Sequence, residues 1–273
     1  MSDAAHAGAP PRITALIAAG RRPGLDAFAA GYGVEDKALI EIAGRPMLAH
    51  VLATLLAHPA IGAVRILTQT PDRLLAHPAI AALAADPRVS FRTGGDSVSA
   101  AVAGAIGDAP EDFPFLLTTA DNPLLDAAMI DHFIAAAHAA QADVAAAVVS
   151  EAVFRPRFPD GKRTWLRFRG GAYSGSNLFW FGSPAAQRAL AVWQTIEQDR
   201  KRGRAVIRAF GVPILIGAGL RLLTLKGALA RAGRRLGLTA IAVELPFAEA
   251  CIDVDKPADH LLATRLLAAR AAR

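Results

Sequence analysis

Cysteine and long apolar runs are nearly absent from this 273-residue sequence. The one cysteine, Cys251, can form neither an internal disulfide nor a cysteine-based zinc site, which suits a reducing cytoplasm. Aromatic residues make up only 6% of the chain, so a core must be built mainly from Ala, Leu, Ile and Val. The most apolar stretch, residues 209–220, is shorter than the ~18–20 residues that cross a bilayer. We therefore expect a cytoplasmic protein, with residues 1–12, which lack signal-peptide features, as a flexible tail.

Acidic residues are missing from one region. No Asp or Glu lies between Asp199 and Glu244, whereas ten basic residues do: Arg200, Lys201, Arg202, Arg204, Arg208, Arg221, Lys226, Arg231, Arg234 and Arg235. The net charge of the whole chain is +6, so this region carries the basicity and the remainder is mildly acidic. We expect an inserted helical lobe over residues 200–237. Residues 200–235 suit a solvated cationic face or contact with an anionic membrane surface; nucleic acid is not expected, because no recognisable motif is present.

Short apolar runs alternate with amphipathic patterns along the chain. Strands are expected at residues 13–20, 63–70, 89–94, 113–121, 142–150, 172–181 and 238–247. Helices are expected at residues 46–57, 71–85, 97–106, 126–140, 184–200 and 256–272, whereas residues 151–170 show little periodicity. This order predicts one α/β domain over residues 13–273, with a three-layer, Rossmann-like architecture and a mostly parallel sheet covered on both faces.

Small residues close the first expected strand. Ala18, Ala19 and Gly20 would let backbone N–H groups approach phosphates closely, and Arg21 and Arg22 would add charged contacts. An ordinary strand-to-loop turn explains these residues equally well, because the GRRPG sequence matches neither P-loop nor Rossmann spacing.

Aspartates at two further positions are candidate metal ligands. Asp121 follows an apolar strand at the sheet edge where α/β proteins bind ligands, and its carboxylate suits Mg²⁺. The alternative is an Asx-type turn that Asp121 and Asn122 make before a proline. Asp253 and Asp255 alternate on an extended stretch and share a face, so a cation would offset their repulsion. Asp255 is also placed to cap the helix that begins near residue 257.

Cations accompany these carboxylates. Lys37 precedes a short apolar strand and a helix, where a solvated surface lysine is the simpler interpretation. A second cationic cluster suits a phosphate-bearing molecule or a solvated loop; it comprises Arg155, Arg157, Lys162, Arg163, Arg167 and Arg169, beside Tyr173 and Asn177.

Four segments in order carry a family resemblance: AAGR at residues 18–21, KALIEIAGRPMLAHVL at 37–52, TTADNPLL at 118–125 and IDVDKPADHLL at 252–262. Together they resemble the nucleotidyltransferases of the nucleotide-diphospho-sugar transferase fold. That group includes the molybdenum-cofactor nucleotidyltransferases (MobA-like) and the methylerythritol-phosphate cytidylyltransferases. The resemblance covers residues 13–150 and returns at 172–181 and 251–262.

The resemblance implies that an NTP reacts with a phosphorylated acceptor, with Mg²⁺ as cofactor, and that pyrophosphate is released. Lys37, with Arg21 and Arg22, would stabilise charge at the phosphates, and Asp121 with Asp253 or Asp255 would bind the metal. The nucleotide-binding residues would be Ala18, Ala19, Gly20, Gly95, Asp96 and Ser97, and the acceptor-binding residues Asn177, Arg163 and Tyr173. The GGDSV sequence favours CTP, then GTP, although Asp96 is equally suited to cap a helix.

The acceptor stays open at this point. A lipid-headgroup or polyprenyl-type phospho-alcohol fits the basic lobe, and a molybdenum-cofactor-type guanylyl or cytidylyl acceptor is the alternative. A glycosyltransferase is disfavoured, because ADNPLL stands where an Asp-x-Asp motif is usual. The family usually has Gly-x-Gly-x-Arg-Met-Gly after the first strand and proline before the lysine, where this chain has GRRPG and Asp36. These departures keep open a non-catalytic nucleotide-binding protein docked at a membrane.

Overall fold

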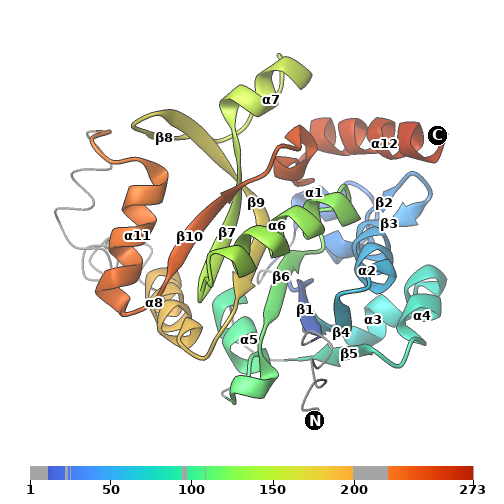
Figure 1. Ribbon diagram of the computed structural model, residues 1–273. Coiled ribbons are helices and arrows are strands. Elements are labelled where there is room, and N and C mark those ends of the chain that lie inside the picture. The colour runs from blue at the N-terminus through green and yellow to red at the C-terminus, as the bar shows by residue number, and fades with distance from the viewer. Residues whose placement is uncertain are drawn as a thin grey trace, which may run out of the picture.

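One mixed sheet of eight strands organises the computed structural model, which describes residues 12–21, 24, 26–93, 97–107, 109–198 and 221–272 (Figure 1). Seven strands follow one path, in the order β10 (Ala240–Glu244), β7 (Val144–Ser150), β9 (Gly171–Phe181), β6 (Phe115–Thr119), β1 (Ile13–Ala18), β4 (Ile61–Leu67) and β5 (Val89–Arg92); β8 (Leu166–Phe168) pairs with β9 beside this path. This confirms the predicted three-layer α/β fold.

Strand β1 lies where the direction of strand addition reverses. It pairs in parallel with β4 on one side and with β6 on the other. The chain adds β4 and β5 first and then crosses to β6, so the reversal lies between β1 and β6. Open α/β sheets bind their ligands in the crevice beyond the carboxyl ends of the strands at such a point.

Strand β9 is the exception to the parallel order. It runs antiparallel between β6 and β7, and its register against β7 shifts between Ala146 and Val148. Asn177 lies opposite this shift with φ of +46°, in the left-handed region. Three residues of β9, at positions 176–178, therefore lie opposite the single β7 residue Ala147, and a bulge of this kind bends a strand and redirects its side chains.

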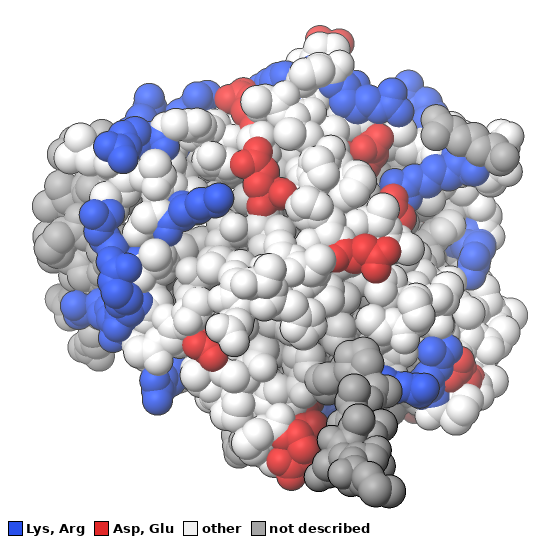
Figure 2. All heavy atoms as spheres, viewed as in Figure 1, with Lys and Arg blue, Asp and Glu red and all other residues white. Residues whose placement is uncertain are grey.

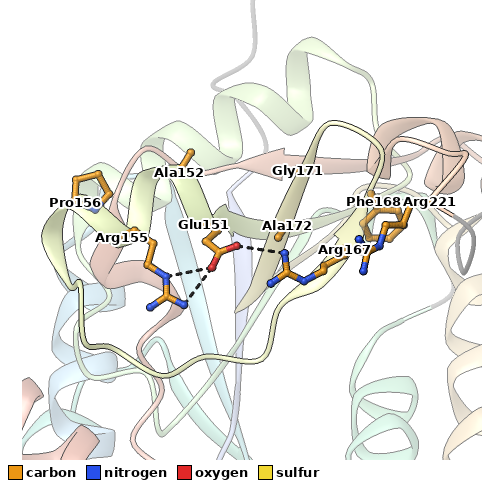
Figure 3. Close-up of a pocket in the computed structure, with 9 residues that line it drawn as sticks. All are labelled: Glu151, Ala152, Arg155, Pro156, Arg167, Phe168, Gly171, Ala172 and Arg221. Atoms are coloured by element: carbon orange, nitrogen blue, oxygen red, sulfur yellow. Dashed lines mark hydrogen bonds and ion pairs between the residues drawn. The ribbon is translucent and has the colours of Figure 1, made fainter.

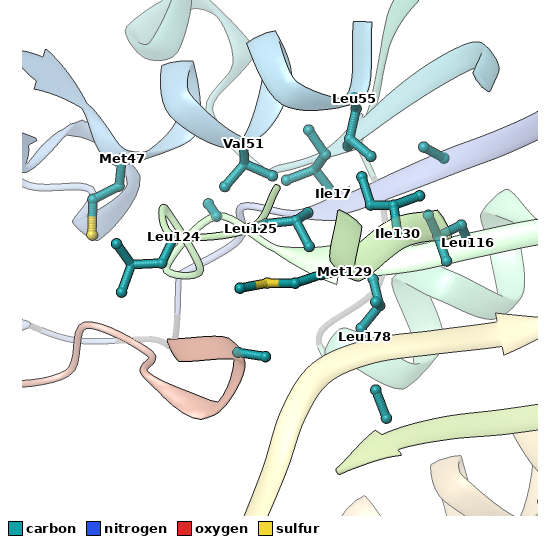
Figure 4. Packing of buried hydrophobic residues seen from close by; sticks show 14 of the residues in the cluster. Ile17, Met47, Val51, Leu55, Leu116, Leu124, Leu125, Met129, Ile130 and Leu178 are labelled. Carbon is teal, nitrogen blue, oxygen red and sulfur yellow. The ribbon is translucent and has the colours of Figure 1, made fainter. Parts of the chain in front are cut away.

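Hydrophobic side chains fill both faces of the sheet. Because successive strand residues point to opposite faces, Ile17 of β1 packs with helices α2 (Met47–Ala57) and α6 (Ala127–Ala139), as Figure 4 shows. Leu16 packs instead with α5 (Val98–Ala105) and α8 (Ala186–Gln198). Both strand residues are fully buried, and burying one such side chain stabilises a fold by ~1.5–3 kcal/mol.

Short elements and a C-terminal helix complete the described chain. They are α1 (Ala27–Ala30), η1 (Lys37–Leu39), β2 (Glu41–Ile42), β3 (Arg45–Pro46), η2 (Pro110–Asp112), η3 (Ala248–Cys251) and α12 (Pro257–Ala271). In Figure 1, α12 passes close to the β2–β3 pair.

Two local expectations were wrong. The helix expected over residues 71–85 is two helices, α3 (Pro71–Leu75) and α4 (Pro78–Ala84), because the residue before a proline disfavours helical backbone. Residues 151–170, expected to be irregular, contain α7 (Glu151–Arg157) and β8. Ser150 caps α7 by accepting a hydrogen bond from the Val153 N–H, and β8 is held by pairing with β9.

The basic lobe is described in part. Helix α11 (Leu225–Leu236) begins at the Thr224 cap and ends at Gly237, whose φ of +67° favours glycine. Residues 199–220 lie outside the described residues, as do residues 1–11 of the tail expected at 1–12. Figure 2 shows Lys and Arg gathered along the edge where Figure 1 places α11. Among the described helices, none combines the length and apolar character needed to cross a membrane.

Candidate active site

Lys37 and two distant aspartates form the centre of the candidate site. Lys37 lies in η1, and its Nζ is 2.6 Å from the Asp121 Oδ2. The same ammonium donates to the Asp255 carboxylate. The three residues are separated by 84 and 134 positions along the chain, so only the fold brings them together. The surface-lysine alternative is therefore excluded: the Lys37 side chain is 22% exposed and ion-paired.

Backbone hydrogen bonds hold the segments that carry these side chains. The Ala120 N–H donates to the Ala18 carbonyl (3.0 Å), which fixes the end of β6 against the end of β1. The Val254 N–H donates to the Asp121 carbonyl (2.9 Å), so the segment with Asp253 and Asp255 lies against Asp121. The site thus stands at the carboxyl edge of β1 and β6, the crevice that the strand order predicts.

Neither aspartate takes the purely local role considered for it. The Asp121 carboxylate accepts hydrogen bonds from Lys37 and from the Thr119 hydroxyl. The N-cap residue of α12 is Lys256, without a side-chain cap hydrogen bond, so Asp255 is not the cap of that helix.

Crowded negative charge dominates the electrostatics. Burial, together with the neighbouring negative charges of Asp255 and Asp121, raises the pKa of Asp253 to about 6. Burial by itself would lower the pKa of Lys37, but the charges and hydrogen bonds of Asp121 and Asp255 outweigh it and raise that pKa. The Lys37 ammonium thus pairs with two of the three carboxylates, and a further cation would relieve the repulsion that Asp253 experiences from Asp121 and Asp255.

The donor set fits magnesium better than a transition metal. Asp121, Asp253 and Asp255 offer carboxylate oxygens, which Mg²⁺ prefers, and Mg²⁺ usually needs only one or two of them beside substrate phosphates and water. Within the described part of the chain, no three or more His, Cys, Asp or Glu side chains form a group that could hold a metal ion. The arrangement suits a metal that arrives with a phosphate ligand.

The turn after β1 is held by a residue that the sequence did not single out. The Arg21 N–H donates to the Gln69 Oε1 (3.1 Å), and a Cβ on Gly20 would lie only 3.0 Å from the same oxygen. Gln69 comes after β4, which is paired with β1. A polar residue at the end of a strand expected beside the first one is the signal that would have identified it. The Arg21 guanidinium lies 3.8 Å from the Glu35 carboxylate.

The unusual residue before Lys37 has a structural role. Asp36 is 2% exposed, and its carboxylate accepts hydrogen bonds from the Thr70 hydroxyl and the Arg73 guanidinium (3.2 Å each). These contacts tie the Lys37 turn to the end of β4, so Asp36 positions the lysine where the family has proline.

Of the other residues predicted to contact the nucleotide, the structure describes only some. Arg22, Gly95 and Asp96 lie outside the described residues. Ser97 caps α5 by accepting a hydrogen bond from the Ala100 N–H (3.2 Å), the capping role considered for its neighbour.

The predicted acceptor residues are not gathered in one place. Asn177 is adjacent to Ser176, whose carbonyl accepts a hydrogen bond from the Asn122 amide (3.4 Å), next to Asp121. Tyr173 lies further along β9, opposite Ser150. Arg163 is 7% exposed and forms an ion pair of 2.9 Å with Asp259, which is equally buried. Their acceptor-binding roles remain predictions, and Asn177 is the one nearest the Lys37 centre.

Comparison with known proteins shows which family this chain is similar to. A curated relative, the 2-C-methyl-D-erythritol 4-phosphate cytidylyltransferase of Aeromonas hydrophila subsp. hydrophila, is 36% identical over 125 residues, or 43% of this chain. The match spans only half the length of that relative.

Solved structures extend the similarity over nearly the whole chain. A hypothetical transferase from Thermus thermophilus superposes with a TM-score of 0.72 at 29% identity, covering 91% of this chain and 99% of its own. A 4-diphosphocytidyl-2C-methyl-D-erythritol synthase superposes with a TM-score of 0.56 over 94% and 98%, and at 17% identity it supports the fold alone. The model of the MobA-like NTP transferase domain matches residues 17–236, most of the chain. The chain therefore belongs to the MobA-like NTP transferase family, whose members are nucleotidyltransferases.

Proposed function

We propose that this protein transfers a nucleoside monophosphate from an NTP to a phosphorylated acceptor and releases pyrophosphate. The observation that carries this proposal is the Lys37 ammonium between Asp121 and Asp255, at the sheet edge where β1 and β6 end. A cation and several carboxylates beside a turn of small residues match the needs of phosphoryl chemistry, in which charge neutralisation and positioning supply the catalysis.

The reaction would proceed by in-line displacement. An acceptor phosphate oxygen attacks the α-phosphorus of the NTP, a new phosphorus–oxygen bond forms, and the bond to the β-phosphate bridging oxygen breaks. The bonding electrons leave with pyrophosphate. The attacking phosphate is already ionised at neutral pH, so no general base is needed. Lys37 would stabilise the negative charge that builds on the α-phosphate oxygens, and the turn at Ala18–Ala19–Gly20 would hold the phosphate chain.

Magnesium fits this site through Asp121 together with Asp253 or Asp255. When bound, Mg²⁺ would neutralise phosphate charge and orient the phosphates for displacement. The hydrogen bond that the Thr119 hydroxyl donates to the Asp121 carboxylate would hold this carboxylate in position for the metal. Lys37, now shared among carboxylates, would then be available to the substrate phosphates.

CTP is the proposed donor, with GTP as the second candidate. Support comes from the GGDSV sequence at residues 94–98 and from the cytidylyltransferase relative. The acceptor class includes lipid-headgroup and polyprenyl-type phospho-alcohols, with molybdenum-cofactor-type acceptors as the alternative. Helix α11 presents exposed cations, including Lys226, Arg231 and Arg234, that suit an anionic membrane. Charge reversal at Arg231 and Arg234 should then abolish binding to anionic vesicles.

The experiment is a thermal-shift and pyrophosphate-release screen with Mg²⁺. It pairs CTP, GTP, UTP and ATP with phosphorylated alcohols, sugars and pterin-type acceptors. A shift selective for one nucleotide, with pyrophosphate release for one acceptor class, would support the proposal. The Asp121→Asn variant should abolish release, whereas the matched Asp131→Asn variant, at an exposed helix position away from the site, should retain it. No shift with any nucleotide would overturn the proposal and favour a non-catalytic protein.

A further inference from the structure

A shallow surface cavity of about 820 Å³, wide open to solvent, lies apart from the Lys37 centre, between α7 and the β8–β9 pair (Figure 3). Its walls combine guanidinium groups with apolar surface. The apolar part comes from Phe168, Pro156 and Ala172. The charged part comes from Arg155, Arg167, Arg221 and Glu151. Among the described lining residues, three cations thus face one carboxylate, so this part of the lining carries a net positive charge.

Two of these arginines are available to a ligand, and the third is held in place. Arg155 donates to the Pro159 and Gly161 carbonyls (3.1 Å each) and pairs with Glu151 (3.1 Å), so its position is set by the protein. Arg167 is 53% exposed and approaches Glu151 only to 3.8 Å, a contact that contributes little in water. Figure 3 shows Arg155 and Arg167 reaching Glu151 from opposite sides.

Arg221 completes the cationic wall from a distant part of the chain. The segment that follows it is anchored by the Arg169 N–H, which donates to the Leu223 carbonyl (2.9 Å). This contact brings Arg221 to the hairpin that carries Arg167, although 54 residues separate them. Two guanidinium forks on one side of a cavity are suited to an oxyanion, because each can donate two parallel hydrogen bonds to it.

The cavity and the Lys37 centre lie along the same strand. Ala172, at the cavity, and Asn177, near Asp121, are five residues apart in β9. A regular strand rises by ~3.3 Å per residue, so the two positions are separated by at most about 17 Å. A molecule that reaches from one to the other must be elongated.

We propose that this cavity binds a phosphoryl group at the far end of the acceptor, with Arg167 and Arg221 as its ligands. Arg155 positions Glu151, and Phe168 contacts the carbon portion of the molecule. The acceptor is then an elongated compound that carries one phosphate for attack and a second anionic group for recognition. The assignment to the acceptor rests on the proposed function, whereas anion binding in the cavity does not.

The first test titrates inorganic phosphate into ¹⁵N-labelled protein and follows the arginine side-chain N–H signals by NMR. Saturable shifts of the Arg167 and Arg221 signals are expected. Arg167→Gln and Arg221→Gln should each weaken phosphate binding about tenfold or more, the effect of losing a charge-assisted hydrogen bond. The matched Arg265→Gln variant, which removes an exposed arginine of α12, should leave it unchanged. No saturable shift, or equal affinity in all three variants, would overturn the proposal.

A second variant separates this proposal from the proposed function. Lys37→Met should abolish turnover and leave the phosphate-dependent shifts of Arg167 and Arg221 intact. With an active protein and an identified acceptor, Arg167→Gln should raise the KM for that acceptor and leave the KM for the nucleotide unchanged. Loss of the Arg167 and Arg221 shifts in Lys37→Met would mean that phosphate acts at the catalytic centre alone, and the proposal would fail.

The source of the phosphoryl group is distinguished with vesicles. Leu166 and Leu222 are each 60% exposed beside Arg167 and Arg221 and could enter a lipid surface. A lipid source predicts binding to phosphatidylcholine vesicles that contain phosphatidic acid, and loss of that binding in the Leu166→Ser, Leu222→Ser double variant with phosphate binding retained. A soluble source predicts phosphate binding without vesicle binding. Vesicle binding that is equal in wild type and in the Arg167→Gln, Arg221→Gln double variant, with no phosphate shifts, would overturn the proposal.

Discussion

The Lys37 Nζ lies 2.6 Å from the Asp121 Oδ2, and both side chains are 22% exposed. This pair joins the turn before β2 to the end of β6. An ion pair at this depth is screened less than one at the surface, so each partner sets the electrostatic environment of the other. Asp255 contacts the same ammonium from the C-terminal part of the chain.

Removing either partner of this pair should nearly abolish turnover. Lys37→Met or Asp121→Asn is expected to lower kcat by roughly 10²–10³, the typical cost of losing one preorganised contact to the transition state. Pyrophosphate release under saturating nucleotide measures the effect. Circular dichroism should show a folded protein in both cases, because the hydrophobic core is untouched. Lys226→Met, which removes an exposed lysine of α11, should keep full activity in a soluble assay, and activity retained by Asp121→Asn would refute the metal assignment.

Asp253 should make Mg²⁺ binding depend on pH. Its pKa of about 6 in the metal-free protein means that a proton competes with the metal as the pH falls through 6. We therefore expect the Mg²⁺-induced rise in Tm to shrink between about pH 7 and pH 5. Asp253→Asn should weaken the rise at neutral pH and remove its pH dependence in this range. A rise that is equally large at both pH values in the wild type would contradict this.

The raised pKa of Asp253 also makes the stability of the metal-free protein depend on pH. The folded state binds this proton more tightly than the unfolded state, where an aspartate titrates near ~3.9. Asp253 therefore disfavours folding above pH 6, and this unfavourable contribution disappears as the pH falls toward 4. Urea unfolding of the wild type and of Asp253→Asn at both pH values would measure it.

Asn177 allows backbone and side-chain roles to be separated. Its φ of +46° is strained for most residues but not for glycine. We expect Asn177→Ala to lower the free energy of unfolding by ~1 kcal/mol and Asn177→Gly to have a smaller effect. If the amide contacts the acceptor, both variants should raise the acceptor KM alike. If the acceptor KM instead rises more in Asn177→Ala than in Asn177→Gly, in line with the loss of stability, Asn177 acts through its backbone conformation alone.

The buried ion pair of Arg163 and Asp259 should contribute to the stability of the fold. Arg163→Met leaves the Asp259 carboxylate buried without its partner, which typically costs ~3–5 kcal/mol of stability. The Arg163→Met, Asp259→Leu double variant should recover part of this loss, since no uncompensated charge remains. Urea unfolding checks both. A stable Arg163→Met protein with a raised acceptor KM would favour the acceptor-binding role predicted from the sequence.

The order of elements was predictable because each strand and helix carries its own pattern. The apolar run at β6 and the Asp126 cap of α6 are local signals, and the structure follows them. Helix α7 and strand β8 were missed. Prolines at 156 and 159 obscure the helix in the sequence, and β8 depends on its pairing with β9.

For the candidate site too, some features were predictable from the sequence and others were not. The sequence alone determined which residue types were available: a lysine, three aspartates and a small-residue turn, of which Asp121 and the turn were tied to strand ends by hydrophobic patterning. Only the tertiary structure decided that Lys37 contacts both Asp121 and Asp255, that Gln69 holds the turn, and that Arg163 is buried against Asp259. The reason is physical: patterning acts over a few residues, whereas these contacts join segments many residues apart, and strand order and register decide which ends meet.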